Sequence, residues 1–239
     1  MRNYFTLDGT DSRSFEVYIS GQGTFDSSSR SLDMIQVPGR NGDLIGLSTR
    51  LTNGVLTYKD CLIYTNFNAN IAALRAFLLS KTGYRRLVDT YHPDEYRLVA
   101  YRGPMQVSPN TRNSAGRFTL QFECMPQRFL LSGETAVVLT ASGTITNPTM
   151  FAVKPLLRVT TTRATASVLG VGSTNITLTR QGVTYIDCET GRAYNGATPY
   201  DAYVSLNTID FPTLEPGSNG ITLGTGISRV EITPRWWTV

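Results

Sequence analysis

The chain has 239 residues, a length that suits one large domain or two small ones. Apolar residues make up 41% and charged residues 17% of the sequence, which excludes an intrinsically disordered chain. The formal net charge is +4, but the basic residues are scattered and do not form the stripe that direct nucleic-acid recognition needs.

The first 65 residues read as short strands joined by turns. "SFEVYIS" (residues 14–20) alternates apolar and polar side chains, which predicts a half-buried strand. In "VPGRNGDLIG" (residues 37–46), Pro38-Gly39 predicts a type II turn and Asn41-Gly42 a type I′ turn. A further Asn-Gly pair at residues 53–54 predicts a second reversal. A meander and an extended hairpin both fit this pattern.

One helix is predicted, over residues 68–84, with Asn68 or Asn70 as the N-cap. Its apolar residues recur at helical spacing and predict a face that packs on the core, with partner binding as the alternative. Strands are predicted at residues 96–103 and 117–126. The second has the cleanest alternation in the sequence and places Cys124 on the apolar face as a buried thiol.

The composition changes near residue 130, where small residues and threonine become frequent. We therefore predict two domains, residues 1–132 and residues 133–239. The second half contains apolar runs separated by glycine-rich turns at short spacing, and no segment with helical periodicity. This pattern is typical of an antiparallel β-sandwich. The predicted fold class is mainly β, with a single helix in the N-terminal domain.

No motif in the sequence indicates catalysis or a bound cofactor. His92 is the only histidine, no nucleophile elbow accompanies it, and "TYHPDEY" around it reads as a turn. The three cysteines lie far apart, which predicts free thiols made in a reducing cytoplasm rather than a metal site. A two-carboxylate glycosidase is harder to exclude, because its two acids can come from anywhere in the fold, but solvated or ion-paired acids are the better explanation of the 18 acidic residues. We therefore expect no catalytic, cofactor-binding or metal-binding residues, and a protein that acts by assembly or binding.

Neither secretion nor membrane insertion is expected from the sequence. "MRNYFTLDGTDS" at the start has no apolar segment of the kind found in signal peptides. The most apolar stretch, "IAALRAFLL" (residues 71–79), is too short to cross a membrane. The pair Trp236-Trp237 could stack on a sugar, but we favour a role in plugging an interface or the end of the sandwich.

Several stretches in one order resemble the distal tail (Dit) proteins of siphophages. The N-terminal ones are "VPGRNGDL", "LTYKDCLIY", the single helix, "RRLVDTYHPDEYRLVAYRG" and "FTLQFECMPQRFL". The C-terminal ones are "YIDCETGRAYNG", "FPTLEPGSNGI" and "VEITPRWW". The resemblance covers nearly the whole chain. It implies an N-terminal β-sandwich with one α-helix and a long β-hairpin, followed by a galectin-like or jelly-roll-like antiparallel sandwich.

The resemblance also implies a function. Proteins of this family form a homohexameric ring, with a central channel for DNA passage, at the distal end of the tail. Expected partners are further copies of the chain, the tail tube protein, the tail-associated tip protein and receptor-binding or other baseplate proteins. DNA would pass without specific recognition, and no membrane would be contacted. The chain would be made in the bacterial host cytoplasm and reside in the virion, at the tail tip.

The hairpin tip is the candidate interface in this interpretation. It comprises Pro38, Gly39, Arg40, Asn41, Gly42 and Asp43, with Arg40 and Asp43 expected near a subunit contact. The alternatives are a tail tube or other tail ring component, and a carbohydrate-binding tail module.

Overall fold

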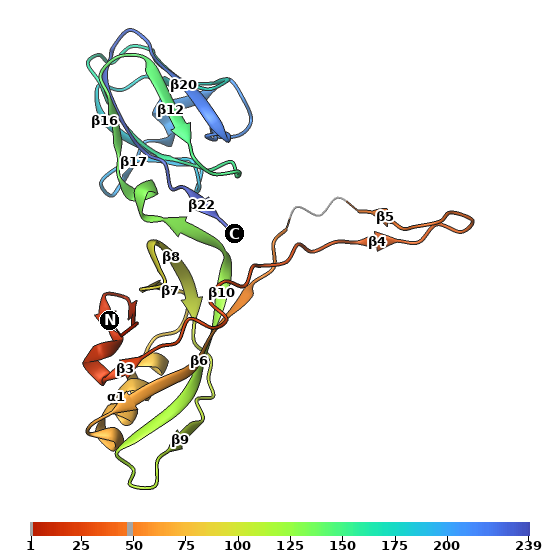
Figure 1. Ribbon diagram of the computed structural model, residues 1–239. Helices are drawn as coiled ribbons and strands as arrows, with labels where there is room; N and C mark the ends of the chain where they lie inside the picture. The colour runs from red at the N-terminus through yellow and green to blue at the C-terminus, as the bar shows by residue number, and fades with distance from the viewer. Residues whose placement is uncertain (1, 47–49) are drawn as a thin grey trace. The chain divides into compact units, whose positions relative to one another are not determined.

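The computed structural model describes residues 2–46 and 50–239. The chain divides into two compact units, Met1–Arg128 together with Val239, and Phe129–Thr238. Both units are mainly β, and the described residues contain one α-helix (Figure 1). Each unit has its own cluster of buried apolar side chains. The predicted fold class is therefore confirmed.

The N-terminal unit is built on one curled sheet with strand order β2-β1-β7-β8-β10-β6-β3, to which β9 adds by pairing with β10. The expected N-terminal sandwich thus takes the form of a single sheet that curls around its core. Two further strands, β4 and β5, pair only with each other. The elements are β1 (Phe5–Leu7), β2 (Thr10–Asp11), η1 (Ser12–Phe15), β3 (Val17–Tyr18), β4 (Met34–Ile35), β5 (Leu44–Ile45), β6 (Gly54–Tyr64), α1 (Phe67–Leu79), β7 (Arg85–Asp89), β8 (His92–Ala100), β9 (Val107–Pro109) and β10 (Ala115–Leu130).

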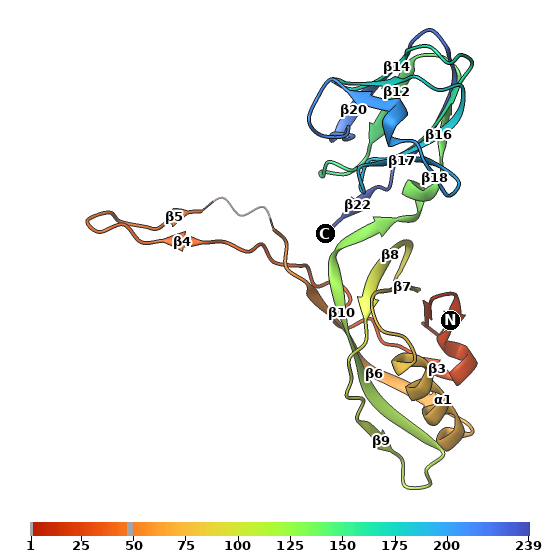
Figure 2. The ribbon, with the colours of Figure 1, turned by 180° about the vertical axis from the view of Figure 1, so that it is seen from behind.

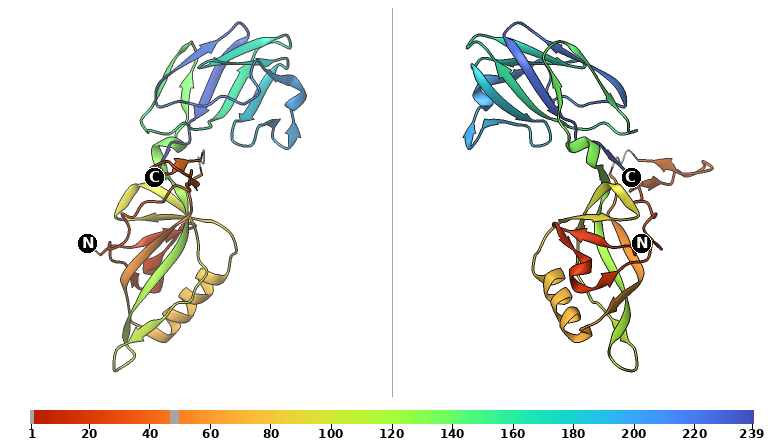
Figure 3. Two further views of the ribbon diagram at one scale, coloured as in Figure 1. Left: turned by 90° about the vertical axis from the view of Figure 1, so that its right-hand side faces the viewer. Right: turned by 60° about the vertical axis from the view of Figure 1, so that its left-hand side comes forward.

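Strand β10 is longer than predicted but keeps the predicted alternation. Phe118, Leu120, Phe122 and Cys124 are buried in the core, whereas the residues between them lie on the solvent side. Because the side chains of a strand alternate between its two faces, this pattern fixes which side of the sheet is covered. The covered side receives α1, as the two views of Figure 3 show.

The helix forms where its apolar spacing predicts, but it begins earlier than expected. Its N-cap is Asn66, which has left-handed backbone angles and makes no capping hydrogen bond with its side chain. The prediction of Asn68 or Asn70 as N-cap is wrong, because both lie inside the first turn. The Asn70 side chain instead donates to the Thr65 carbonyl, at 2.9 Å. The predicted apolar face is buried through Ile71 and its helical neighbours one and two turns on.

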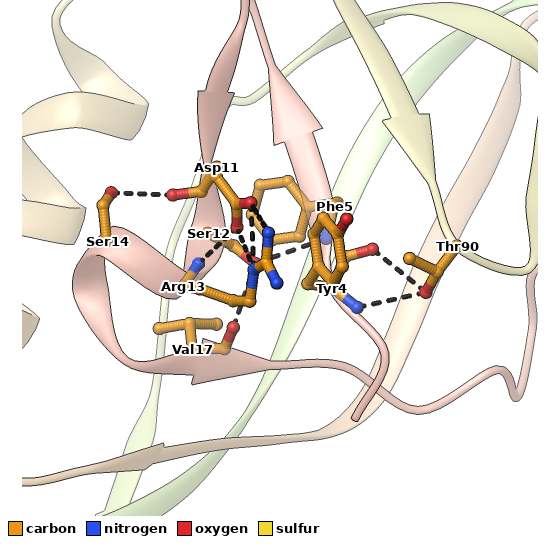
Figure 4. Close-up of polar contacts among 8 residues, drawn as sticks. All are labelled: Tyr4, Phe5, Asp11, Ser12, Arg13, Ser14, Val17 and Thr90. Carbon is orange, nitrogen blue, oxygen red and sulfur yellow. Dashed lines mark hydrogen bonds and ion pairs between the residues drawn. The ribbon is translucent and has the colours of Figure 1, made fainter. Parts of the chain in front are cut away.

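The segment predicted as one strand from residue 14 to residue 20 is strand only at its centre. It is preceded by the short helix η1, which Asp11 caps by accepting a hydrogen bond from the Arg13 amide at 2.8 Å. The Ser12 hydroxyl donates to the Val17 carbonyl at 2.9 Å and closes the turn into β3 (Figure 4). Local side-chain capping therefore replaces the first half of the predicted strand.

The turn predicted around His92 lies two residues earlier, between β7 and β8. Asp89 forms it, because its Oδ1 accepts hydrogen bonds from the amides of Tyr91 and His92, both at 2.9 Å. The other oxygen of Asp89 accepts from the Tyr58 hydroxyl at 2.7 Å, inside the core. His92 thus begins a strand, and Pro93 lies within that strand.

The C-terminal unit is a sandwich of two antiparallel sheets, as predicted. Their strand orders are β11-β21-β13-β16-β17-β18 and β12-β20-β14-β15-β19. The elements are η2 (Leu131–Glu134), β11 (Val137–Leu139), β12 (Gly143–Asn147), β13 (Leu156–Thr161), β14 (Ser167–Val171), β15 (Thr174–Leu178), β16 (Gly182–Asp187), β17 (Arg192–Asn195), β18 (Thr198–Pro199), η3 (Asp201–Tyr203), β19 (Val204–Leu206), β20 (Gly217–Leu223), β21 (Ile227–Thr233) and β22 (Trp237–Thr238).

The two tryptophans belong to the packing of this sandwich. Trp236 is buried in the core cluster of the unit. Trp237 stacks on Phe151, with 4.3 Å between ring centroids and 24° between ring planes. Trp236 therefore has no free face for a sugar, and Trp237 packs against the same cluster while it stays partly exposed. A role in plugging an interface or the end of the sandwich stays a prediction.

Candidate functional site

A long hairpin projects from the N-terminal unit, and we call its described residues, 29–46 and 50–52, the arm. The Thr52 amide donates to the Ser29 carbonyl at 2.9 Å, and the Gly46 amide to the Asp33 carbonyl at 2.7 Å. Between these points and the tip, β4 and β5 pair in antiparallel register. Figures 1 and 2 show the arm as a ribbon that extends away from the sheet of its own unit. Of the two forms left open by the sequence, the structure has the extended hairpin.

The first predicted turn forms the tip of the arm. The Arg40 amide donates to the Val37 carbonyl at 3.2 Å, which places Pro38 and Gly39 at the two central positions. Gly39 has a φ of 80°, as the second central residue of a type II turn requires. A side chain there would meet no atom within 4 Å, so the positive φ alone explains the glycine.

The other two turn predictions are wrong in different ways. Gly42 has a φ of 81°, but Asn41 does not have the positive φ that a type I′ turn needs at both centres. Pro38-Gly39 and Asn41-Gly42 therefore belong to a single reversal of the chain at the tip of the arm. At Asn53-Gly54 no reversal occurs, because Gly54 opens β6 and pairs with Cys124 of β10. Long-range pairing overrides the local turn signal there.

The arm exposes apolar side chains along both of its strands. Every residue from 32 to 45 is exposed, and Met34 and Ile45 keep 57% and 63% of their surface in solvent. An isolated two-stranded hairpin is at best marginally stable in water, and grouped exposed apolar residues mark interaction surfaces. The arm is therefore suited to being covered by a partner. Its large exposed apolar residues are Leu32, Met34, Ile35, Val37, Leu44 and Ile45.

The structure brings the six predicted interface residues together at the tip, where all of them are exposed. Their contact with a second subunit stays a prediction. The apolar residues of the two strands were not part of that prediction. The signal was available in "DMIQV" and "LIG", which place apolar residues on both sides of the turn.

Metal binding and glycoside hydrolysis, two chemistries considered from the sequence, find no support in the parts of the chain that the structure describes. Among the described residues, no group of three or more His, Cys, Asp or Glu side chains could hold a metal ion. The ring of His92 packs edge-on against Phe25, with 4.8 Å between centroids. A hollow of about 470 Å³ beside β6 and β10 is lined by one carboxylate, Asp60. That hollow lacks the facing pair of acids that glycoside hydrolysis uses.

The three cysteines are free, as predicted, and all three are buried, as predicted for Cys124. Burial raises the thiol pKa to about 12 for Cys61, about 11 for Cys124 and about 12 for Cys188. Thiols with such pKa values are inert at neutral pH, so their role is in packing. Within the described part of the chain, no helix is long and apolar enough to cross a membrane.

Comparison with known proteins identifies the fold. Neither protein-family models nor curated proteins give a match. The chain is similar to the Dit protein of phage SPP1, described as a paradigm of the hub adsorption apparatus in phages that infect Gram-positive bacteria. The match covers 100% of both chains, with a TM-score of 0.78 and 17% sequence identity.

Two structures of the phage P2 baseplate in its activated conformation also match. With calcium, the TM-score is 0.53 at 12% identity, over 97% of this chain and 98% of that chain. With strontium, the TM-score is 0.52 at 11% identity, over 96% and 97%. At these identities the likeness shows the fold alone, and the chain has the fold of the Dit protein of phage SPP1.

Proposed function

We propose that the protein is a structural component of a phage tail, a hub of the Dit type at the distal end of the tail tube. The observation that carries this proposal is the fold match to the SPP1 Dit protein over the full length of both chains. The match includes both the arm-bearing unit and the sandwich, so it is more specific than a shared sandwich would be. We expect such a hub to act by assembly, because the matched protein is described as a hub of an adsorption apparatus.

The arm suggests how such a hub assembles. A closed ring uses two different patches on each subunit, one that reaches out and one that receives. The arm has the form of the first patch, because its apolar residues are exposed on a ribbon that its own unit leaves uncovered. We infer a homohexameric ring in which each arm packs on a neighbouring copy. Arg40 and Asp43 would lie near that contact, and a ring structure with both residues solvated would contradict this placement.

The remaining assignments follow from the same proposal. Residues 1–132 would build the ring and residues 133–239 would form its peripheral sandwich. The ring would join the tail tube protein, the tail-associated tip protein and the receptor-binding or other baseplate proteins of the host-adhesion apparatus. DNA would pass through the central channel without specific recognition. The protein would be made in the host cytoplasm and reside at the tail tip of the virion.

Mass measurement tests the ring. Light scattering over a wide concentration range should show a species of about 158 kDa, six copies of the 26.3 kDa chain. Negative-stain images of the same samples should show six-fold rings. A monomer at every concentration, even with the tail tube and tip proteins added, would contradict the proposal.

A ring alone does not separate a hub from a tail tube component. Electron cryo-microscopy of the virion does, because a tube component would repeat along the shaft and a hub would occur only at the tip. A carbohydrate-binding module is the remaining alternative. It predicts hits on a glycan array from a chain that stays monomeric.

A further inference from the structure

Two arginines, Arg97, which is buried, and Arg128, which is partly buried, hold the segment from which the arm starts. We call this segment, Thr24 to Asp26, the root. Arg97 Nη2 donates to the Thr24 carbonyl, and Arg128 Nη2 donates to the Asp26 carbonyl, both at 2.6 Å. Arg97 lies 73 positions after Thr24 in the sequence, and Arg128 lies 102 positions after Asp26. The root is therefore fixed by the sheet through β8 and the end of β10, before the chain enters the arm.

One carboxylate lies within ion-pair reach of both arginines. Glu95 Oε1 is 3.6 Å from Arg97 Nη2 and 3.6 Å from Arg128 Nη1. The same oxygen is 3.7 Å from Nδ1 of His92, whose ring packs against Phe25 at the centre of the root. Arg97, Arg128 and His92, which contact the root, therefore all lie near Glu95 as well.

The two arginines need this carboxylate because they repel each other where solvent screens them little. Their side chains are 8% and 15% exposed. Burial lowers the pKa of Arg128, and the charge of Arg97 lowers it further, whereas Glu95 and Asp89 act in the opposite direction. The oxygens of Asp89 are already engaged by Tyr58 and by the turn amides. Glu95 is therefore the carboxylate that offsets the two positive charges, and its Oε1 does so by charge alone, because it makes no hydrogen bond to a described residue.

We propose that Glu95 is the positioning residue of the arm. It holds Arg97 and Arg128 side by side and, through their hydrogen bonds to the root, sets the direction in which the arm leaves the sheet. The local part of this inference, that Glu95 fixes the root through the two arginines, applies to a single chain outside any assembly. Its consequence for ring closure rests on the function proposed above.

Direction matters because the arm is a long lever. A strand rises about 3.3 Å per residue, so the dozen or so residues from the root to the tip span about 40 Å. A swing of about 10° at the root would move the tip by about 7 Å, more than the width of one strand-to-strand spacing. An arm that leaves at a variable angle would meet its site on a neighbouring copy less often. Ring closure would then need a higher protein concentration.

Hydrogen exchange on the full chain, at a concentration below assembly, tests the local part. In Glu95→Gln, we expect the Thr24 amide, which donates to the Gly21 carbonyl, to exchange about tenfold faster or more. The thermal midpoint should change by only a few degrees. Glu123→Gln is the matched control. Glu123 pairs with the exposed Arg102 at 3.3 Å, so the control should leave exchange at the root unchanged.

The two parts of the inference have separate outcomes. Unchanged exchange at the root in Glu95→Gln would overturn the positioning role, whether or not rings form. If that variant does not fold, Arg128→Gln replaces it, because it removes the hydrogen bond to Asp26 and leaves the carboxylate in place. Faster exchange with ring formation shifted to about tenfold higher concentration would support both parts. Faster exchange with wild-type ring formation would support the positioning role and contradict the arm as the ring contact.

Discussion

The exposed apolar residues on the two strands of the arm, which we call its apolar rows, offer the most direct test of the assembly proposal. We would change Met34, Ile35, Leu44 and Ile45 to threonine in one variant. Threonine has a β-branched side chain, which favours strands, so the strand propensity of the arm is kept. All four residues are exposed, so the N-terminal unit should lose no more than about 0.5 kcal/mol per substitution in its free energy of unfolding.

The expected effect on assembly follows from the exposed fractions. Complete burial of a side chain of this size contributes about 1.5–3 kcal/mol. The four residues keep between 39% and 63% of their surface in solvent. Covering that remainder on a neighbour would contribute roughly 1 kcal/mol each. Threonine recovers part of this, so the variant should lose about 3 kcal/mol per interface, or about a hundredfold in the dissociation constant.

Light scattering over a concentration series measures this shift, and circular dichroism melts check the fold. A control variant changes the same number of exposed apolar residues in the C-terminal unit, namely Val138, Met150, Val168 and Ile209, to threonine. The control should assemble at the wild-type concentration. The reasoning is refuted if the arm variant assembles like the wild type, or if the control loses assembly to the same extent.

Three further outcomes are expected. Tyr58→Phe should lower the unfolding free energy by about 1.5–3 kcal/mol in urea titrations, because a buried Asp89 carboxylate loses its hydroxyl donor. Burial alone would raise the pKa of Asp187, but Arg235 lowers it overall from 3.8, so their pair should stabilise the C-terminal unit above pH 3.8 and lose this effect below it. Melts of Arg235→Gln should show a weaker acid dependence, because only the Glu189 and Thr190 amides then lower the pKa of Asp187. A thiol reagent at pH 8 should leave all three buried cysteines unmodified until the protein is unfolded.

The elements that the sequence predicts well are those whose signal repeats along the chain. Phe118 to Cys124 alternate over one strand, and α1 repeats its apolar face over three turns, so errors at single residues do not change the outcome. Asn53-Gly54 shows the opposite case. A strong two-residue turn signal fails there, because β6 begins at Gly54 and gains a long ladder with β10 from that residue on.

The candidate site also has parts that the sequence predicts and parts that it does not. The Pro38-Gly39 turn depends only on local backbone preference and is predicted correctly. The apolar residues that flank this turn are not covered by any other part of their unit that the structure describes. The sequence does not predict this exposure, because a buried hairpin would have the same residues. The cluster of Glu95, Arg97 and Arg128 is still harder to predict from the sequence. It depends on contacts between residues 73 and 102 positions apart, which no periodicity encodes.

The charges of the arm restrict what can cover it. Arg30, Asp33, Arg40, Asp43 and Arg50 interrupt the apolar rows, and all five are exposed. Charged residues in an exposed edge strand prevent it from pairing unspecifically with the edge strands of other molecules. A partner that covers the apolar rows must also present groups that match these charges, since an unpaired buried charge is costly. A uniformly apolar surface, such as the interior of a lipid layer, cannot meet that requirement, whereas a folded protein surface can.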